Sequence, residues 1–141
     1  MASCVFPSAK VSMLNGTFNL DTDDATLHCA LMHGYVLDDA HDFFDDVVAD
    51  EVATAGNYVH LGEPLTGSAI SAAHPDAMWD AADVAWANAT IHATGAIIFM
   101  NRGGLHSADD LVAWIDFGGN KDSTAAEFKI AWNVAGIMTI A

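Results

Sequence analysis

Cations are scarce in this chain of 141 residues, because Lys and Arg number 4 against 19 Asp and Glu and the net charge is -15. Binding to nucleic-acid phosphates requires clustered cations, so we expect no nucleic-acid partner. An anionic membrane surface is disfavoured for the same reason. Every apolar run is also far shorter than the about 18 residues of a membrane-spanning helix, so we expect no membrane span.

Cysteine is also sparse, with Cys4 near the amino terminus and Cys29 in an expected strand. The sequence alone does not decide whether a disulfide joins them. Two free thiols are the expected state, because cysteine packs as a small apolar residue. Residues 1–7 lack the basic region and the long apolar run of a signal peptide. We therefore expect the protein to be made in a cytosol.

Apolar residues make up 52 % of the chain and charged residues 16 %, which is typical of one well-packed domain. The chain is organised around two expected strands, residues 90–100 and 111–117, joined by a polar loop. Alternation places Ile91, Ile97 and Phe99 on the core face of the first strand, together with Ala93 and Gly95.

Other short strands follow at regular intervals, including residues 25–32, 127–132 and 137–140. A turn is expected at residues 87–89, and a tight turn at residues 133–136 is expected to join the last two strands as a hairpin. A short helix is expected with Ser8 as its cap and with Val11 and Leu14 on the side that docks onto the domain, and the glycine-rich stretch 118–123 is expected to be a mobile loop. The pattern predicts an all-β fold: an antiparallel β-sandwich, with a jelly roll as one form of it. Residues 1–24 form a short helix or arm in this interpretation, and residues 25–141 form the β-sandwich domain.

No catalytic constellation is evident, and the sequence predicts no enzyme and no cofactor. The seven histidines lack the spacing of a zinc motif, so no catalytic, cofactor-binding or metal-binding residue is assigned. Two weaker alternatives stay open. Acidic groups at Asp21 to Asp24 and at Asp42, Asp45 and Asp46 suggest Ca²⁺ coordination or simply solvated loops. Four tryptophans suggest a sugar-binding platform or core packing, at Trp79, Trp86, Trp114 and Trp132.

Several segments together carry a resemblance to a known family. They are residues 26–31, 41–44, 83–86, 95–98, 114–121, 128–133 and 136–137, and the Ile115-Asp116-Phe117-Gly118 block with the Trp132-Asn133 turn is the most specific part. In this order the chain resembles small structural proteins of tailed bacteriophages, which are labelled virion structural, head decoration or cement proteins.

The resemblance implies a protein of the virion that binds the outside of a capsid and stabilises the shell. Its implied partners are the major capsid protein and copies of itself, with a homotrimer as the expected oligomer. Assembly would take place in the bacterial cytoplasm, and residues 1–20 would act as an arm that orders on the lattice. The alternative is a tail-associated module that binds a host glycan.

Overall fold

The computed structural model describes residues 3–17, 19–21 and 26–141. Most of the elements are strands, and every strand pair is antiparallel. In chain order the elements are β1 (Cys4–Val5), α1 (Pro7–Leu14), β2 (Leu27–Met32), the 3-10 helices η1 (Phe44–Asp46) and η2 (Val48–Asp50), β3 (Glu63–Pro64), β4 (Ala69–Ala73), β5 (Asp76–Asp80), β6 (Val84–Met100), η3 (His106–Ala108), β7 (Leu111–Ile130) and β8 (Met138–Ile140).

The strands form two sheets, one in the order β1-β7-β6-β2-β3 and the other in the order β4-β5-β8. The predicted all-β fold with a short amino-terminal helix is therefore confirmed. The pairings of β6 with β7 and of β4 with β5 join strands that are adjacent in the sequence, whereas β2 pairs with β6 and β8 pairs with β5 across longer separations. Strands from elsewhere in the chain thus extend these two hairpins into the two sheets.

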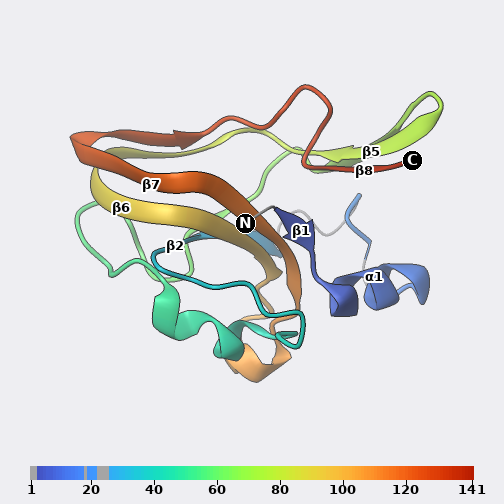
Figure 1. Cartoon of the computed structure of the whole chain (residues 1–141), viewed down its shortest axis with the longest axis horizontal. Coiled ribbons are helices and arrows are strands. Elements are labelled where there is room, and N and C mark those ends of the chain that lie inside the picture. The colour runs from blue at the N-terminus through green and yellow to red at the C-terminus, as the bar shows by residue number, and fades with distance from the viewer. Residues whose placement is uncertain (1–2, 18, 22–25) are drawn as a thin grey trace.

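The long hairpin of β6 and β7 folds back on itself at one end of the molecule. One part of it lies beside β2, and the other part lies in the layer that contains β5 and β8 (Figure 1). Irregular pairing makes the bend possible, because the register shifts three times between Trp86 and Gly95. Asn88 and Ala125 adopt positive φ angles of 49° and 46° in this region. Bulges of this kind are how a single strand turns a corner between packed layers. The predicted turn at residues 87–89 is instead a bulge inside β6.

The central strands are buried on both faces over part of their length. Alternation holds at the start, where Ile91 and Ala93 are buried and His92 is exposed, but from Gly95 onward every residue of β6 is buried. The segment after β2 covers part of this half, because Phe44 of η1 stacks on Phe99 with ring centroids 4.1 Å apart. The prediction of a single core face was therefore correct only for the first half of this stretch.

Two predictions about the carboxyl-terminal third were wrong. Residues 118–123 lie inside β7: residues 117–120 form a bulge, in which Gly118 has φ 73°, and pairing resumes where Lys121 lies opposite Ala93. The glycine and asparagine residues that suggested a loop supply this irregular backbone instead. The last strand also does not pair with β7 as a hairpin. β8 crosses to the other sheet and pairs with β5, with Met138 opposite Trp79.

The amino-terminal segment is packed onto the larger sheet. Cys4 pairs with Trp114 of β7, and the Phe6 N–H donates a 3.0 Å hydrogen bond to the carbonyl of Val112. Phe6 and Ala9 are fully buried, at 0 % and 1 % exposure. The helix begins with Pro7, so the prediction that Ser8 caps it is wrong. Residues 3–14 thus contribute to the folded core, in contrast to the expected free arm.

Candidate functional site

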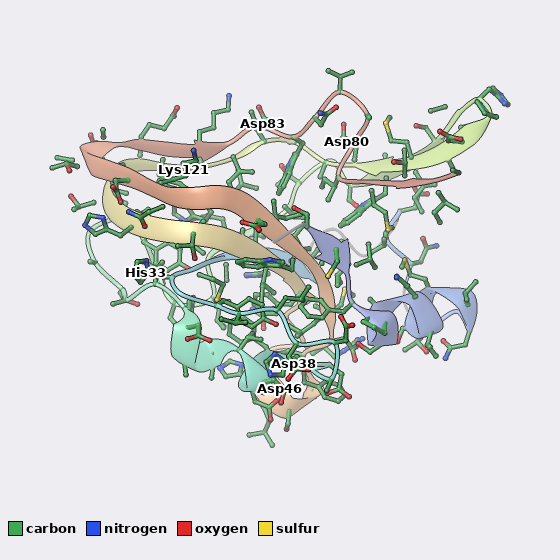
Figure 2. The ribbon with its side chains drawn as sticks, viewed as in Figure 1. His33, Asp38, Asp46, Asp80, Asp83 and Lys121 are labelled. Atoms are coloured by element: carbon green, nitrogen blue, oxygen red, sulfur yellow. The ribbon has the colours of Figure 1, made fainter. Side chains whose placement is uncertain are left out.

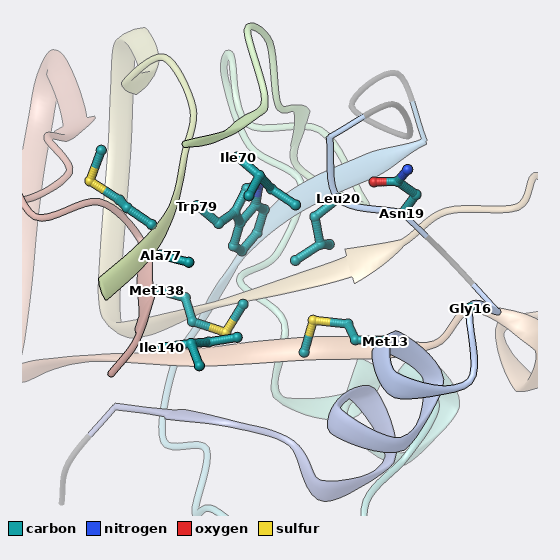
Figure 3. Close-up of a pocket in the computed structure, with 10 residues that line it drawn as sticks. Met13, Gly16, Asn19, Leu20, Ile70, Ala77, Trp79, Met138 and Ile140 are labelled. Carbon is teal, nitrogen blue, oxygen red and sulfur yellow. The ribbon is translucent and has the colours of Figure 1, made fainter. Parts of the chain in front are cut away.

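An apolar groove lies between α1 and the three-stranded sheet. Its volume is about 410 Å³, and one polar side chain, that of Asn19, lies among its lining residues. Met13 of α1 and Met138 of β8 point toward each other across it (Figure 3). The rest of the lining comes mainly from the sheet and the segment before β2, at Gly16, Leu20, Ile70, Ala77, Met78, Trp79 and Ile140.

A buried chain of hydrogen bonds fixes the floor of the apolar groove. Trp79 is 2 % exposed, and its indole Nε1 donates a 2.7 Å hydrogen bond to the hydroxyl of Ser68. Ser68 in turn donates to the carbonyl of Leu20. The Ile70 N–H donates to Asp21 Oδ1 at 2.9 Å, which ties the same segment to β4. The groove therefore has a rigid base, since hydrogen bonds join the Trp79 indole, the Ser68 hydroxyl and the Leu20 carbonyl.

The walls of the apolar groove are adaptable and partly exposed. Three methionines line it, and their unbranched thioether side chains fit partners of varied shape. The bordering elements also carry exposed apolar side chains: Leu14 is 89 % exposed, Ile140 62 % and Ile70 49 %. The expected docking of Val11 and Leu14 onto the domain is wrong, because both point to solvent. Exposed apolar surface next to a groove is typical of a protein-binding site.

The acidic clusters do not gather into one site. Asp38 and Asp46 lie at one end of the molecule, and Asp80 and Asp83 lie in the other layer (Figure 2). Asp46 Oδ2 accepts hydrogen bonds from the N–H groups of Asp42 and Phe43, at 3.0 and 3.2 Å, and these bonds lower the pKa of Asp46. This carboxylate therefore holds the backbone of η1. Of the other proposed Ca²⁺ loop, residues 22–25 lie outside the described residues.

The tryptophans are mainly core residues. Trp79, Trp86 and Trp114 are at most 2 % exposed. Of the two alternatives, core packing is therefore confirmed at these positions, and an open sugar-binding platform is wrong. Trp132 is only half-buried, and its indole Nε1 donates a 3.0 Å hydrogen bond to the carbonyl of Ala82. The expectation that Trp132 is a core residue is therefore wrong. It packs against the edge of the core.

The two cysteines are free, as expected. Cys29 is completely buried in β2, and burial raises the pKa of its thiol to about 12. Cys4 is half-buried in β1, and burial also raises the pKa of its thiol, although less. Neither thiol is therefore an activated nucleophile.

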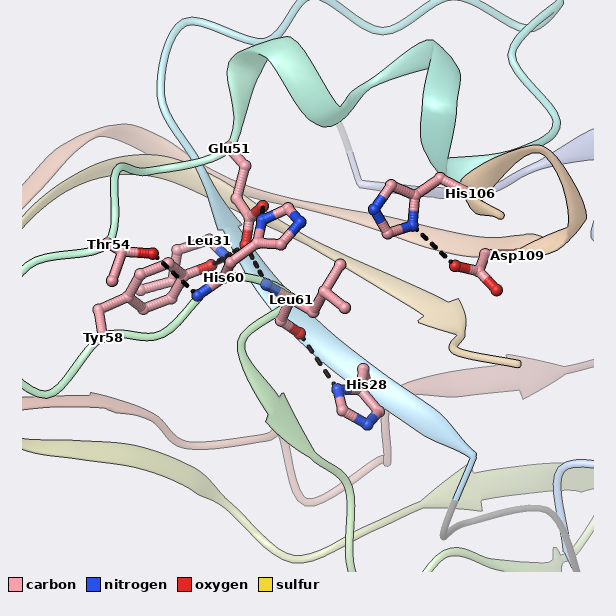
Figure 4. Close-up of polar contacts among 9 residues, drawn as sticks. All are labelled: His28, Leu31, Glu51, Thr54, Tyr58, His60, Leu61, His106 and Asp109. Atoms are coloured by element: carbon pink, nitrogen blue, oxygen red, sulfur yellow. Dashed lines mark hydrogen bonds and ion pairs between the residues drawn. The ribbon is translucent and has the colours of Figure 1, made fainter. Parts of the chain in front are cut away.

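Sequence reasoning missed a polar cluster that joins two loops (Figure 4). His60 and His106 are far apart in the sequence, and the structure brings their ring centroids to 5.5 Å. Each ring contacts a buried carboxylate, Glu51 or Asp109. The spacing of His106 and Asp109, three residues apart at a short helical turn, was the one signal available. Among the described residues, no group of three or more His, Cys, Asp or Glu side chains is arranged to hold a metal ion.

Comparisons with protein-family models, with curated proteins and with solved structures find no match for this chain. The resemblance to phage structural proteins therefore rests on the sequence segments alone. Within the described residues, no helix combines the length and apolar character needed to cross a bilayer.

Proposed function

We propose that this protein is a structural protein of a virion, which attaches to the outer surface of a capsid and stabilises the shell. The apolar groove is the observation that carries the proposal. A groove of about 410 Å³ with a rigid floor and methionine walls suits apolar side chains of another protein. The resemblance to phage decoration proteins supplies the identity of that partner, the major capsid protein.

The sheet beside the groove offers a second means of attachment. β4 and β8 are the edge strands of the β4-β5-β8 sheet. Their sequences, Ala-Ile-Ser-Ala-Ala and Met-Thr-Ile, contain none of the charged residues or prolines that commonly protect an edge from pairing. A strand of the partner would therefore extend the sheet while its side chains enter the groove.

The charge of the chain favours a basic partner surface. With a net charge of -15, the protein is attracted to exposed Lys and Arg of a partner. One small domain offers limited contact area, so firm attachment requires several domains to act together. We propose a homotrimer, because linked copies multiply weak contacts. The location is accordingly the virion, after assembly in the bacterial cytoplasm.

The alternative, a tail-associated module that binds a host glycan, has less support. A glycan platform requires exposed aromatic rings, and Trp79, Trp86 and Trp114 are buried.

A sedimentation assay tests the proposal with two matched variants. Purified protein is mixed with undecorated shells of its virus, and the bound fraction is measured after centrifugation. We expect saturation at a ratio set by the lattice. Ile140→Asp at the groove should abolish binding, and Leu105→Asp should leave it unchanged, because Leu105 is also exposed, at 78 % against 62 % for Ile140, and lies outside the groove. Absence of binding by the unmodified protein, or equal binding by both variants, contradicts the proposal.

A further inference from the structure

Two histidine rings face each other at the surface, although they come from separate loops. His60 precedes β3, His106 opens η3, and their rings are nearly perpendicular at 75° with centroids 5.5 Å apart. Figure 4 shows that the ring edges are turned toward one another. Both side chains reach solvent, with exposed fractions of 48 % for His60 and 30 % for His106.

A buried carboxylate holds each ring by the same nitrogen. His60 Nδ1 lies 2.5 Å from Glu51 Oε2, and His106 Nδ1 lies 3.0 Å from Asp109 Oδ2. A carboxylate only accepts hydrogen bonds, so each Nδ1 carries its hydrogen and each Nε2 of a neutral ring presents a lone pair. Carboxylates on Nδ1 orient metal-binding histidines in this way and raise their basicity as ligands.

The carboxylates are themselves fixed by further donors. Glu51 Oε1 accepts hydrogen bonds from the Tyr58 hydroxyl at 2.9 Å and from the Leu61 N–H at 2.6 Å. Asp109 Oδ1 accepts a 2.8 Å hydrogen bond from the N–H of Arg102. Neither acid is free to turn away from its histidine, so the two rings are oriented before any ligand arrives.

The backbone beside His60 is strained and tightly packed. Leu61 adopts a φ of 76°, which non-glycine residues rarely do, and its carbonyl accepts a 3.2 Å hydrogen bond from His28 Nδ1. At Gly62 a Cβ would lie 1.9 Å from the carbonyl oxygen of Cys29, so only glycine fits against β2. Strain of this kind costs about 1–3 kcal/mol and is concentrated at functional sites.

The local charge also calls for a cation. The side chains of Glu51 and Asp109 are 3 % and 0 % exposed, so two negative charges are buried here. Within the described part of the chain, no lysine or arginine side chain bonds to either acid. The Arg102 guanidinium pairs with Asp110 instead, at 2.5 Å. Buried carboxylates are stabilised by a nearby positive charge, and an ion bound to His60 and His106 would supply that charge through the two rings.

We propose that His60 and His106 bind one divalent transition-metal ion through their Nε2 atoms, with Zn²⁺ as the reference ion. The ring separation fits: with Zn–N distances of about 2.0–2.1 Å and tetrahedral angles, two coordinated imidazoles have centroids about 5.2 Å apart. Water occupies the remaining coordination positions of the bound ion. This inference is independent of the proposed virion function.

Calorimetric titration of the full chain with Zn²⁺ at neutral pH tests the site. We expect one Zn²⁺ per chain, and a loss of affinity of about tenfold or more in His60→Ala and in His106→Ala. His92→Ala is the matched control, because His92 Nδ1 also contacts a carboxylate, Asp122, at 2.5 Å, while the ring contact between two histidines in the described structure is that of His60 with His106. Ca²⁺, which prefers oxygen ligands, should not bind at this site.

Three results of the same titration would overturn the proposal. Thermal melting of each variant without metal first confirms that it is folded, which the exposure of both rings favours. An unmodified protein with no saturable binding at millimolar Zn²⁺ would refute the site. So would unchanged affinity after either replacement, or an equal loss in His92→Ala. Glu51→Gln, measured in parallel, should weaken Zn²⁺ binding by about 10–100-fold while leaving both ring ligands in place.

Discussion

Replacement of Phe6 by alanine tests whether the amino-terminal segment belongs to the core. Phe6 is 0 % exposed and sits at the junction of β1 and α1, where its N–H bonds to Val112. Truncating a buried phenylalanine costs about 3–5 kcal/mol, as the sum of lost transfer free energy and the cavity left behind. For a chain of this size the melting temperature should fall by roughly 10–20 °C.

Leu14→Ala is the matched control on the same segment. Leu14 is 89 % exposed, so its removal should change the free energy of unfolding by no more than about 0.5 kcal/mol. Because α1 borders the apolar groove, the same variant should bind shells less tightly. Urea denaturation followed by tryptophan fluorescence measures both stabilities. If Phe6→Ala is as stable as the unmodified protein, the segment is an arm after all and the packing argument is refuted.

Three further predictions concern the core, the thiols and the charge. Gly95→Ala should destabilise the protein by about 1–3 kcal/mol in urea denaturation, because its Cβ would lie 2.0 Å from the buried Trp114 ring, whereas Gly104→Ala, with no atom within 4 Å, should be neutral. A thiol reagent should modify Cys4 in the native protein and Cys29 only after unfolding, in a mass-spectrometric time course, since Cys29 is fully buried. Raising the ionic strength should raise the melting temperature, because salt screens the repulsion of a net charge of -15; a fall on adding NaCl would contradict this.

The sequence predicted the class of fold and its central hairpin well, because strand alternation is a local signal. It failed where the backbone departs from regular geometry. The run Gly118-Gly119-Asn120 has the composition of a loop, yet β6 lies alongside and takes it up as a bulge within β7. Such a choice depends on the neighbouring strand, which no local pattern records.

The apolar groove and the histidine pair could not have been predicted for a similar reason. Met13 and Met138 come from opposite ends of the chain and meet only because β8 joins the sheet beside α1. His60 and His106 are brought together by loops whose path depends on the positive φ angles at Leu61 and Gly62. Residue types alone indicated neither contact, since both are long-range products of the topology.

The most direct test of the central claim is a cryo-electron reconstruction of the virus particle that carries this protein. The account predicts density for the domain on the outer face of the capsid, with the apolar groove and the β8 edge against the major capsid protein. Particles that lack the chain, or that hold it with the apolar groove facing solvent, would contradict the account.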